Sequence, residues 1–139
     1  MLVVLDSSVL IAALRSRRGA SFRILELLRK KRFEIAISVP LALEYEATLI
    51  RHSEELGLSV SEATGLVDYL CAAGHHQEIH FLWRPALNDP ADEFILELAV
   101  AGQCPAIVTH NVRDFGGARS FDIAVLTPGE FLRSLREVP

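Results

Sequence analysis

The sequence predicts an α/β fold in which a mostly parallel sheet is covered by helices on both sides. Short apolar runs rich in Val and Ile alternate along the chain with longer stretches of 3.6-residue periodicity. Strands that are separated by helices are joined by crossover connections, as parallel strands require. The chain has 139 residues, of which 50% are hydrophobic, and this suits a single domain spanning residues 1–139.

The elements follow one another in a regular order. Five apolar runs flanked by polar residues are predicted to be strands buried on both faces, at residues 2–5, 34–38, 79–82, 106–109 and 123–126. Six stretches with an apolar stripe are predicted to be helices, at residues 9–14, 22–30, 39–56, 60–73, 91–102 and 128–135. The stretch 74–85 is the least regular and is expected to form a loop on either side of the third strand.

Composition limits the classes of protein. The formal net charge of -4 argues against adhesion to nucleic acid through a basic global surface, although an acidic site that holds divalent cations can still bind a phosphate. Cys71 and Cys104 lack metal-ligand spacing and are expected to be reduced and structural. No apolar run reaches about 18 residues, and no basic leader precedes the first strand. We therefore expect a cytoplasmic protein with no membrane partner.

Asp6 comes directly after the first predicted strand. In a parallel sheet, ligands bind beyond the carboxyl ends of the strands, where the strand order reverses. As an alternative, an Asp at this place caps the next helix, although Ser7 or Ser8 could do so without it. The sequence leaves both interpretations open.

The fourth predicted strand ends in the same way, in Thr109, His110 and Asn111, with Asp114 three residues further on. Asn and Asp are also ordinary turn residues. However, acids that converge at one edge of a sheet repel one another unless a cation is bound among them.

Two predicted helices carry further acids. Glu44 and Glu46 are about 200° apart on a helix, so at most one of them can face the site, and either could simply face solvent. In the helix that begins near Pro90, Asp92 precedes the buried position Ile95 by three residues, which places it at the edge of the apolar stripe. Capping alone also explains an acid there.

Basic residues near these acids are candidates for holding a phosphate backbone. Arg15 ends the helix that follows Asp6, and Arg113 lies beside Asp114. The basic run 29–32 has a simpler explanation, since cations favour the C-terminus of a helix. His75, His76 and His80 have no partner at ligand spacing, so a loop role is favoured over a metal site.

Five stretches together resemble the PIN-domain family, specifically the toxin-like PIN proteins of prokaryotic toxin–antitoxin systems. They are VVLDSSVLIAAL, SVPLALEYEATL, NDPADEFILELAVAG, AIVTHNVRDF and VLTPGEFLRSL, in this order along nearly the whole chain. The resemblance implies a three-layer α/β/α sandwich with a central, mostly parallel sheet. It also implies a ribonuclease that depends on Mg²⁺ or Mn²⁺, a small antitoxin partner, and a homodimer formed through the apolar faces of residues 39–56 and 60–73.

The family's functional positions fall on residues already singled out. The first three acids correspond to Asp6, Glu44 and Asp92, which are the expected metal ligands. The fourth falls on Asn111, a departure that weakens a second metal site because an amide oxygen is neutral. Asp114 is a candidate for the missing carboxylate.

The hydroxyl residues beside these acids have expected roles as well. Ser8 and Thr109 occupy polar positions of the family and are expected to position the substrate or the acids, and Arg15 and Arg113 to bind the substrate.

The predicted activity is hydrolysis of RNA phosphodiester bonds, since divalent cations in an oxygen cage activate water and neutralise phosphoryl charge. Two alternatives remain open. A catalytically degenerate PIN-like module would bind RNA or protein only, as Asn111 would allow. A receiver-like phosphoacceptor domain would explain Asp6 but has no use for Glu44.

Overall fold

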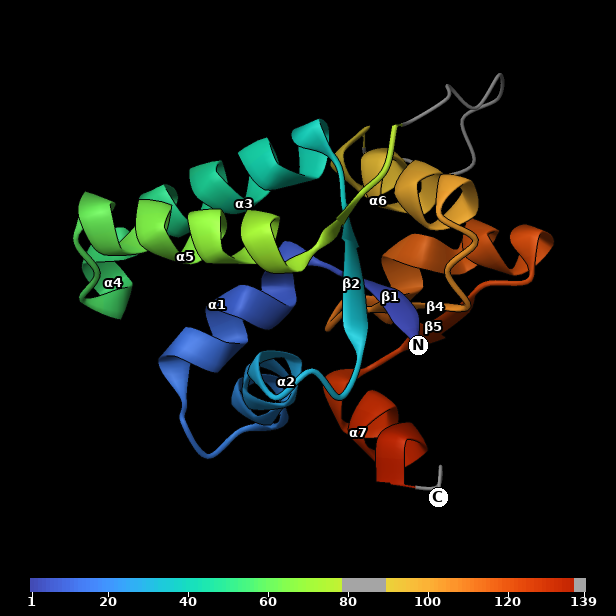
Figure 1. The fold of residues 1–139 in the computed structure, drawn as a ribbon, viewed down its shortest axis with the longest axis horizontal. Coiled ribbons are helices and arrows are strands. Elements are labelled where there is room, and N and C mark those ends of the chain that lie inside the picture. Colours follow the sequence, from blue (N-terminus) through green and yellow to red (C-terminus); the bar gives the residue numbers. More distant parts are fainter. Residues whose placement is uncertain (79–89, 137–139) are drawn as a thin grey trace.

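A computed structural model describes residues 1–78 and 90–136 of the chain (Figure 1). Within these residues the strands form one parallel sheet in the order β3-β2-β1-β4-β5. The strands are β1 (Leu2–Leu5), β2 (Glu34–Ile37), β3 (His75–His76), β4 (Ala106–Val108) and β5 (Ala124–Leu126). The predicted parallel α/β architecture is therefore confirmed.

One strand lies where the sequence predicted a loop. His75 and His76, expected in a loop, pair with Ala36 and Ile37 and form the edge strand β3. The predicted strand at 79–82 lies outside the described residues. Two polar histidines carry no apolar signal, so an edge strand as short as this one escapes a search for buried runs.

The helices lie close to their predicted positions. They are α1 (Ser7–Arg15), α2 (Ala20–Arg29), α3 (Val39–Arg51), α4 (Ser53–Leu56), α5 (Val60–Ala73), α6 (Pro90–Ala101) and α7 (Pro128–Arg136), and a 3-10 segment, η1 (Val112–Phe121), precedes β5. The helix predicted over 39–56 is interrupted at His52. The Ser53 hydroxyl donates to the Ile50 carbonyl, which an unbroken helix would pair with residue 54.

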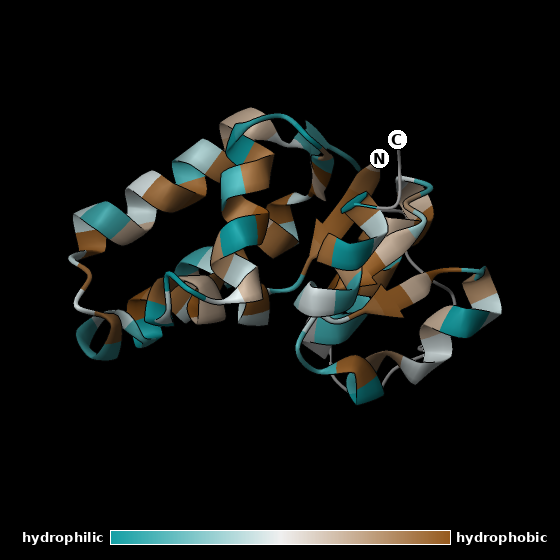
Figure 2. Ribbon diagram, turned by 90° about the horizontal axis from the view of Figure 1, so that it is seen from below, coloured by the Kyte–Doolittle hydropathy of each residue, from teal (hydrophilic) through white to brown (hydrophobic). Residues whose placement is uncertain are grey.

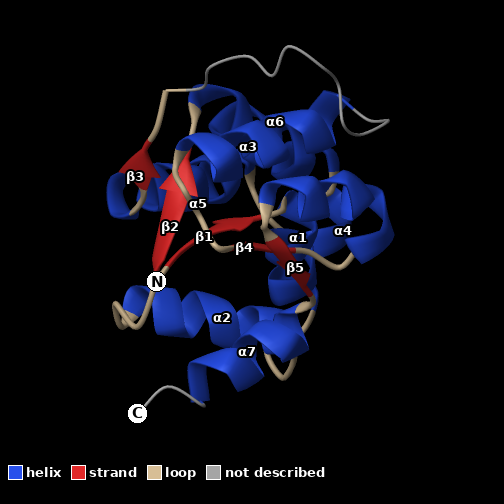
Figure 3. Cartoon of the chain, turned by 90° about the vertical axis from the view of Figure 1, so that its right-hand side faces the viewer, coloured by secondary structure: helices blue, strands red, loops and turns tan. Residues whose placement is uncertain are grey.

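The helices cover both faces of the sheet. In Figure 3, α2 and α7 lie together on one side, while α3, α5 and α6 lie on the other. Helix α1 packs against both α2 and α3. This is the three-layer arrangement that the family resemblance implied.

The core lies between these layers, and Figure 2 shows the strands as its most hydrophobic part. Val3, Val4 and Leu5 of β1 are completely buried, as expected for a strand covered on both faces. Each buried side chain of this size contributes about 1.5–3 kcal/mol. Phe33 and Phe131 pack edge to face, 5.0 Å apart, and join α7 to the start of β2. The central strand is thus a firm base for residues at its end.

The strand order reverses between β1 and β4. The chain builds outward from β1 through β2 to β3, and then returns to the other side of β1 to form β4 and β5. The Asp6 amide donates to the Val108 carbonyl (2.9 Å), so the ends of the two strands lie together. A crevice is expected beyond such a switch point.

None of the helices in the described residues is both long enough and apolar enough to cross a bilayer.

Candidate metal centre

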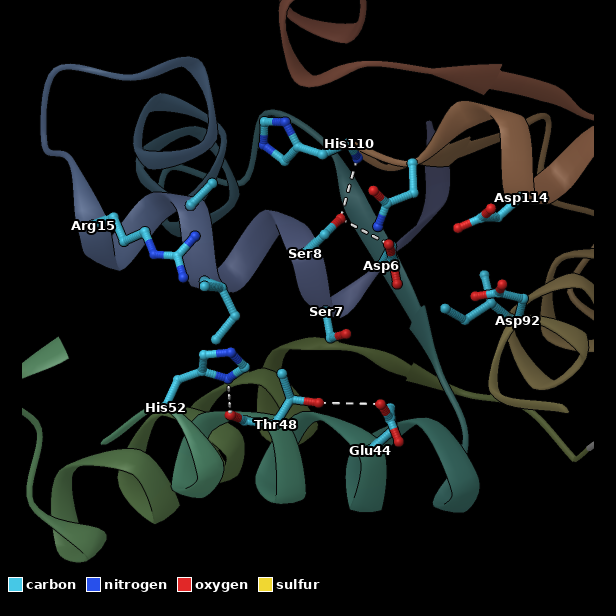
Figure 4. A pocket seen from close by; sticks show the side chains of 14 residues that line it. Asp6, Ser7, Ser8, Arg15, Glu44, Thr48, His52, Asp92, His110 and Asp114 are labelled. Carbon is cyan, nitrogen blue, oxygen red and sulfur yellow. Dashed lines mark hydrogen bonds between the residues drawn. The ribbon is translucent and has the colours of Figure 1, made fainter. Parts of the chain in front are cut away.

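A cavity of about 520 Å³ opens beyond the carboxyl ends of β1 and β4 (Figure 4). It is lined by Asp6, Ser7, Ser8, Ile11, Ala12, Arg15, Glu44, Thr48, His52, Asp92, Ile95, His110, Asn111 and Asp114. Four carboxylates from four separate segments therefore share this cavity. All five acid and amide positions predicted from the sequence line it.

Asp6 is the most buried of these acids, with 6% of its surface exposed. It stands at the N-cap position of α1, yet its side chain makes no capping hydrogen bond. Instead, Oδ2 accepts hydrogen bonds from the hydroxyls of Ser8 and Thr109, both at 2.7 Å. Among the described residues, Oδ1 accepts none. The capping interpretation is therefore wrong, and the carboxylate is held by side chains of α1 and of the end of β4.

The two hydroxyls that hold Asp6 are themselves fixed by the backbone after β4. The His110 amide donates to Ser8 Oγ (3.1 Å), and the Asn111 amide donates to Thr109 Oγ1 (2.9 Å). Because each oxygen accepts from an amide, its own proton is available for the carboxylate. The end of β4 thereby orients the acid at the end of β1.

Thr109 is completely buried. It has no exposed surface to offer a substrate, so of its two expected roles the structure favours that of positioning an acid. It is a positioning residue for Asp6.

Glu44 faces the cavity from α3, whereas Glu46 does not line it. Ser38 caps this helix by accepting a hydrogen bond from the Leu41 amide at 3.2 Å. Thr48, one turn further on, donates to Glu44 Oε1 at 3.1 Å. The helix thus directs only one of its two glutamates to the site, in agreement with the limit that its geometry imposes.

Tyr45 anchors α3 next to Asp6. Its buried hydroxyl donates to the carbonyl of Leu5, the residue before Asp6. Burial raises the pKa of Tyr45 far above its usual value, with a smaller contribution from the charge of Asp6, so the hydroxyl stays a neutral donor. The neighbouring Glu44 is thereby held at the end of β1.

Asp92 and Asp114 lie on the opposite side of Asp6 from Arg15 (Figure 4). Asp92 is half-buried in the first turn of α6, one turn before the buried Ile95, as the stripe predicted. Asp114 is exposed in η1, and Asn111 is exposed at the start of that segment. A 3-10 helix has three residues per turn, so positions 111 and 114 share one face.

The same geometry corrects the prediction for Arg113. This residue does not line the acidic cavity but a separate one, with Phe115, Gly116 and Arg119. The stretch that forms η1 has no periodic pattern in the sequence, so the direction of Arg113 could not be predicted from its neighbour Asp114.

The far end of the cavity is formed by Arg15 and His52. Arg15 Nε donates to Glu55 Oε1 of α4 at 2.8 Å. His52 Nδ1 lies 2.9 Å from the Thr48 carbonyl, which can only accept, so Nδ1 carries a proton. Sequence reasoning missed His52 and Thr48, although positions 44, 48 and 52 recur at the spacing of one helical face.

His110 also lines the cavity, and its Nε2 lies 2.9 Å from the buried Ser21 hydroxyl of α2. The other histidines have structural partners. His75 pairs with Glu34 (3.1 Å), and His76 contacts the Cys71 carbonyl (2.9 Å). His80 lies outside the described residues.

The two cysteines are free thiols. Cys104 is buried, and burial raises its pKa to about 11. Such a thiol is a poor nucleophile and metal ligand, consistent with a structural role.

The chemistry of the donors decides which ion would fit. Across residues 1–78 and 90–136, no three His, Cys, Asp or Glu side chains lie close enough to hold one ion as they stand. However, the four acids that face the cavity, Asp6, Glu44, Asp92 and Asp114, offer oxygen atoms as ligands, and Asp6 Oδ1 accepts no hydrogen bond from the described residues. Hard divalent cations such as Mg²⁺ prefer such donors, so the residues fit this class of ion once the flexible side chains converge.

Comparisons with known proteins agree with the fold. The family model "PIN domain" matches residues 2–113. The fold is similar to VapBC2 from Rickettsia felis, solved bound to a DNA fragment from their promoter, at 15% identity and a TM-score of 0.60, covering 91% of this chain and 98% of that one. It is also similar to VapBC-1 from nontypeable Haemophilus influenzae, at 16% identity and a TM-score of 0.61, covering 93% and 99%. No curated protein matches significantly. Because the family model covers most of the chain, the protein belongs to the PIN-domain family.

Proposed function

We propose that this protein is an endoribonuclease that depends on Mg²⁺ or Mn²⁺ and acts as the toxin of a toxin–antitoxin system. PIN domains are generally nucleases that use divalent metals. The observation that carries the proposal is the meeting of Asp6, Glu44, Asp92 and Asp114 in one cavity at the switch point of the sheet. Membership of the PIN family leaves the receiver-like alternative without support.

The acids have different roles in this proposal. Asp6 and Asp92 are the principal ligands, Glu44 binds the ion directly or through water, and Asn111 and Asp114 complete the rim. The bound ion would supply an activated water and neutralise charge on the phosphoryl oxygens. Ser8 and Thr109 hold Asp6 in place so that little reorganisation accompanies the reaction.

The test compares Asp6→Asn with Asp68→Asn in Mn²⁺-dependent cleavage of single-stranded RNA. Both changes remove one carboxylate charge, but Asp68 is exposed on α5 and does not line the cavity. We expect Asp6→Asn to lower the cleavage rate more than about 100-fold. Removal of a residue that only hydrogen-bonds to a metal ligand typically lowers activity about 10–100-fold, and removal of the ligand itself should lower it further. Full activity of a clean Asp6→Asn preparation would refute the assignment.

A second candidate function is a degenerate module that binds RNA or protein without cleaving it. Asn111 favours it, since a neutral oxygen stands where the family pattern has an acid. Calorimetric titration with Mn²⁺ separates the two candidates. Binding that becomes several-fold tighter in Asn111→Asp supports a working metal site, whereas no binding at millimolar Mn²⁺ in either protein supports the degenerate module.

We further propose two protein partners. One is a small antitoxin, which would insert a segment into the acidic cavity; the two similar structures described above are of VapBC proteins. The other is a second copy of this chain, because α3 exposes Val39 (69%), Leu43 (62%) and Ile50 (38%) at spacings of one helical face. Light scattering should show a dimer that Leu43→Glu dissociates.

We also propose a cytoplasmic location, because the proposed substrate is cellular RNA.

A further inference from the structure

The cavity has two ends of opposite character. Asp92 and Asp114 lie at one end, with Asp6 beside them, while Arg15 and His52 lie at the other (Figure 4). If one phosphodiester of an RNA strand lies at the acidic end, the rest of the strand can extend along the cavity toward the Arg15 guanidinium.

Arg15 already holds an anion. Its Nε and one terminal nitrogen both contact the same oxygen of Glu55, on α4. The two side chains are 53% and 51% exposed, and an ion pair so open to water is weak and easily exchanged for another anion. The planar guanidinium binds phosphate through paired N–H donors in the same way as it binds a carboxylate.

We propose that Arg15 is the binding site for a second phosphate of the RNA strand, and that Glu55 occupies this site until RNA displaces it. The class of ligand rests on the proposed ribonuclease function. The geometry adds a second contact point for RNA, distinct from the place of cleavage. It also adds a carboxylate of the same chain, Glu55, that competes with RNA for Arg15.

The length of α1 fixes the spacing of the two contacts. Ser8, which holds Asp6, and Arg15 are seven positions apart on this helix, or about 10 Å along its axis. Successive phosphates of a stacked strand advance about 3.4 Å, so the second phosphate lies within about three nucleotides of the scissile one. A dinucleotide with a single phosphate cannot span both points, so the KM should fall as the RNA lengthens over this range.

The experiment measures binding rather than cleavage. A phosphorothioate oligouridylate, which resists hydrolysis, carries a fluorescein label, and anisotropy in Mg²⁺ gives its Kd at several salt concentrations. We expect Glu55→Gln to bind about two- to fivefold more tightly than the wild type, because it frees Arg15. We expect Arg15→Gln to bind about five- to tenfold more weakly and to lower the salt slope by about one.

Two neighbours provide matched controls. Glu54→Gln removes the same charge one residue away, from a side chain with no ion pair among the described residues, and Arg17→Gln removes a cation that does not line the cavity. Both should change Kd less than twofold. In the Arg15→Gln background, Glu55→Gln should have no further effect, since the two side chains act on one site.

The outcomes separate this proposal from the proposed function. Three outcomes would overturn the second phosphate site. They are equal effects of Glu54→Gln and Glu55→Gln on the Kd, an effect of Glu55→Gln that persists in the Arg15→Gln background, and no RNA binding by the wild type. Binding that follows the expected pattern without any Mn²⁺-dependent cleavage upholds the site and overturns the nuclease.

Discussion

The two ends of the cavity differ in how the chain holds them. At the acidic end, Asp6 is almost completely buried, and its carboxylate accepts two hydroxyl hydrogen bonds at 2.7 Å that the backbone after β4 keeps in place. At the basic end, Arg15 is half exposed, and its partner Glu55 belongs to the four-residue helix α4. Asp6 is thus part of the core, whereas Arg15 belongs to the surface.

This difference corresponds to two tasks. A group that must meet a reacting atom is most effective when its position is fixed beforehand, which requires burial and satisfied hydrogen bonds. A group that meets the flexible backbone of a substrate can remain adjustable. Changes at the acidic end should therefore affect both stability and rate, whereas changes at the basic end should affect binding alone.

Among the residues that hold the acids in place, the largest effect is expected from Thr109→Val. The change keeps the shape of a buried side chain but takes a donor from Asp6 and an acceptor from the Asn111 amide. We expect the free energy of unfolding to fall by about 1–3 kcal/mol and the cleavage rate to fall about 10–100-fold. Thermal unfolding and single-turnover cleavage measure the two effects.

Ser8→Ala is the matched comparison. Ser8 makes an equally short bond to Asp6 but lines the cavity, where water can replace its hydroxyl. Its cost in stability should be below that of Thr109→Val. Equal costs would show that burial does not distinguish the two donors.

A smaller effect is expected from Tyr45→Phe, which removes the bond from α3 to the Leu5 carbonyl. We expect a loss of about 1–2 kcal/mol near pH 8, measured by urea denaturation. The rate should fall as well, because this bond holds Glu44 beside Asp6. An unchanged rate would mean that packing alone places α3.

Tyr45 also makes stability depend on pH. Its folded pKa is raised by burial above the unfolded value of about 10, so the folded state keeps the phenolic proton more tightly. This stabilisation is complete below pH 10 and decreases above it, by up to about 1.4 kcal/mol per pH unit. Cys104, whose folded pKa is about 11, acts in the same direction in both proteins. The stability difference between wild type and Tyr45→Phe should therefore narrow above pH 10.

The predictability of the site follows the same division. Asp6 and Asn111 could be placed from the sequence because each follows a buried strand, and parallel strands end at one edge of the sheet. Asp92 could be placed because Ile95 marked the buried face of its helix. Wherever an apolar run fixes the backbone, the direction of the neighbouring polar side chain follows from the geometry of the element.

The remaining features lacked such a marker. The edge strand at His75 and His76 has no apolar pattern. At the break between α3 and α4 the Ser53 hydroxyl donates to the Ile50 carbonyl, a contact that the apolar stripe does not indicate. The pairing of Arg15 with Glu55 joins residues 40 positions apart. No local periodicity indicates a contact of this kind, so only the folded chain reveals that Arg15 is paired with Glu55.

The smallest effect is expected from Arg113→Gln, and it tests this point directly. The sequence placed Arg113 with Arg15 as a substrate-binding residue, but the structure places it in another cavity, with Arg119. Arg113→Gln should therefore change the KM for a short RNA less than twofold, whereas Arg15→Gln should raise the KM several-fold with little change in kcat. A rise in KM of similar size for both variants would mean that the strand also crosses η1, and that the basic surface of the site extends beyond Arg15.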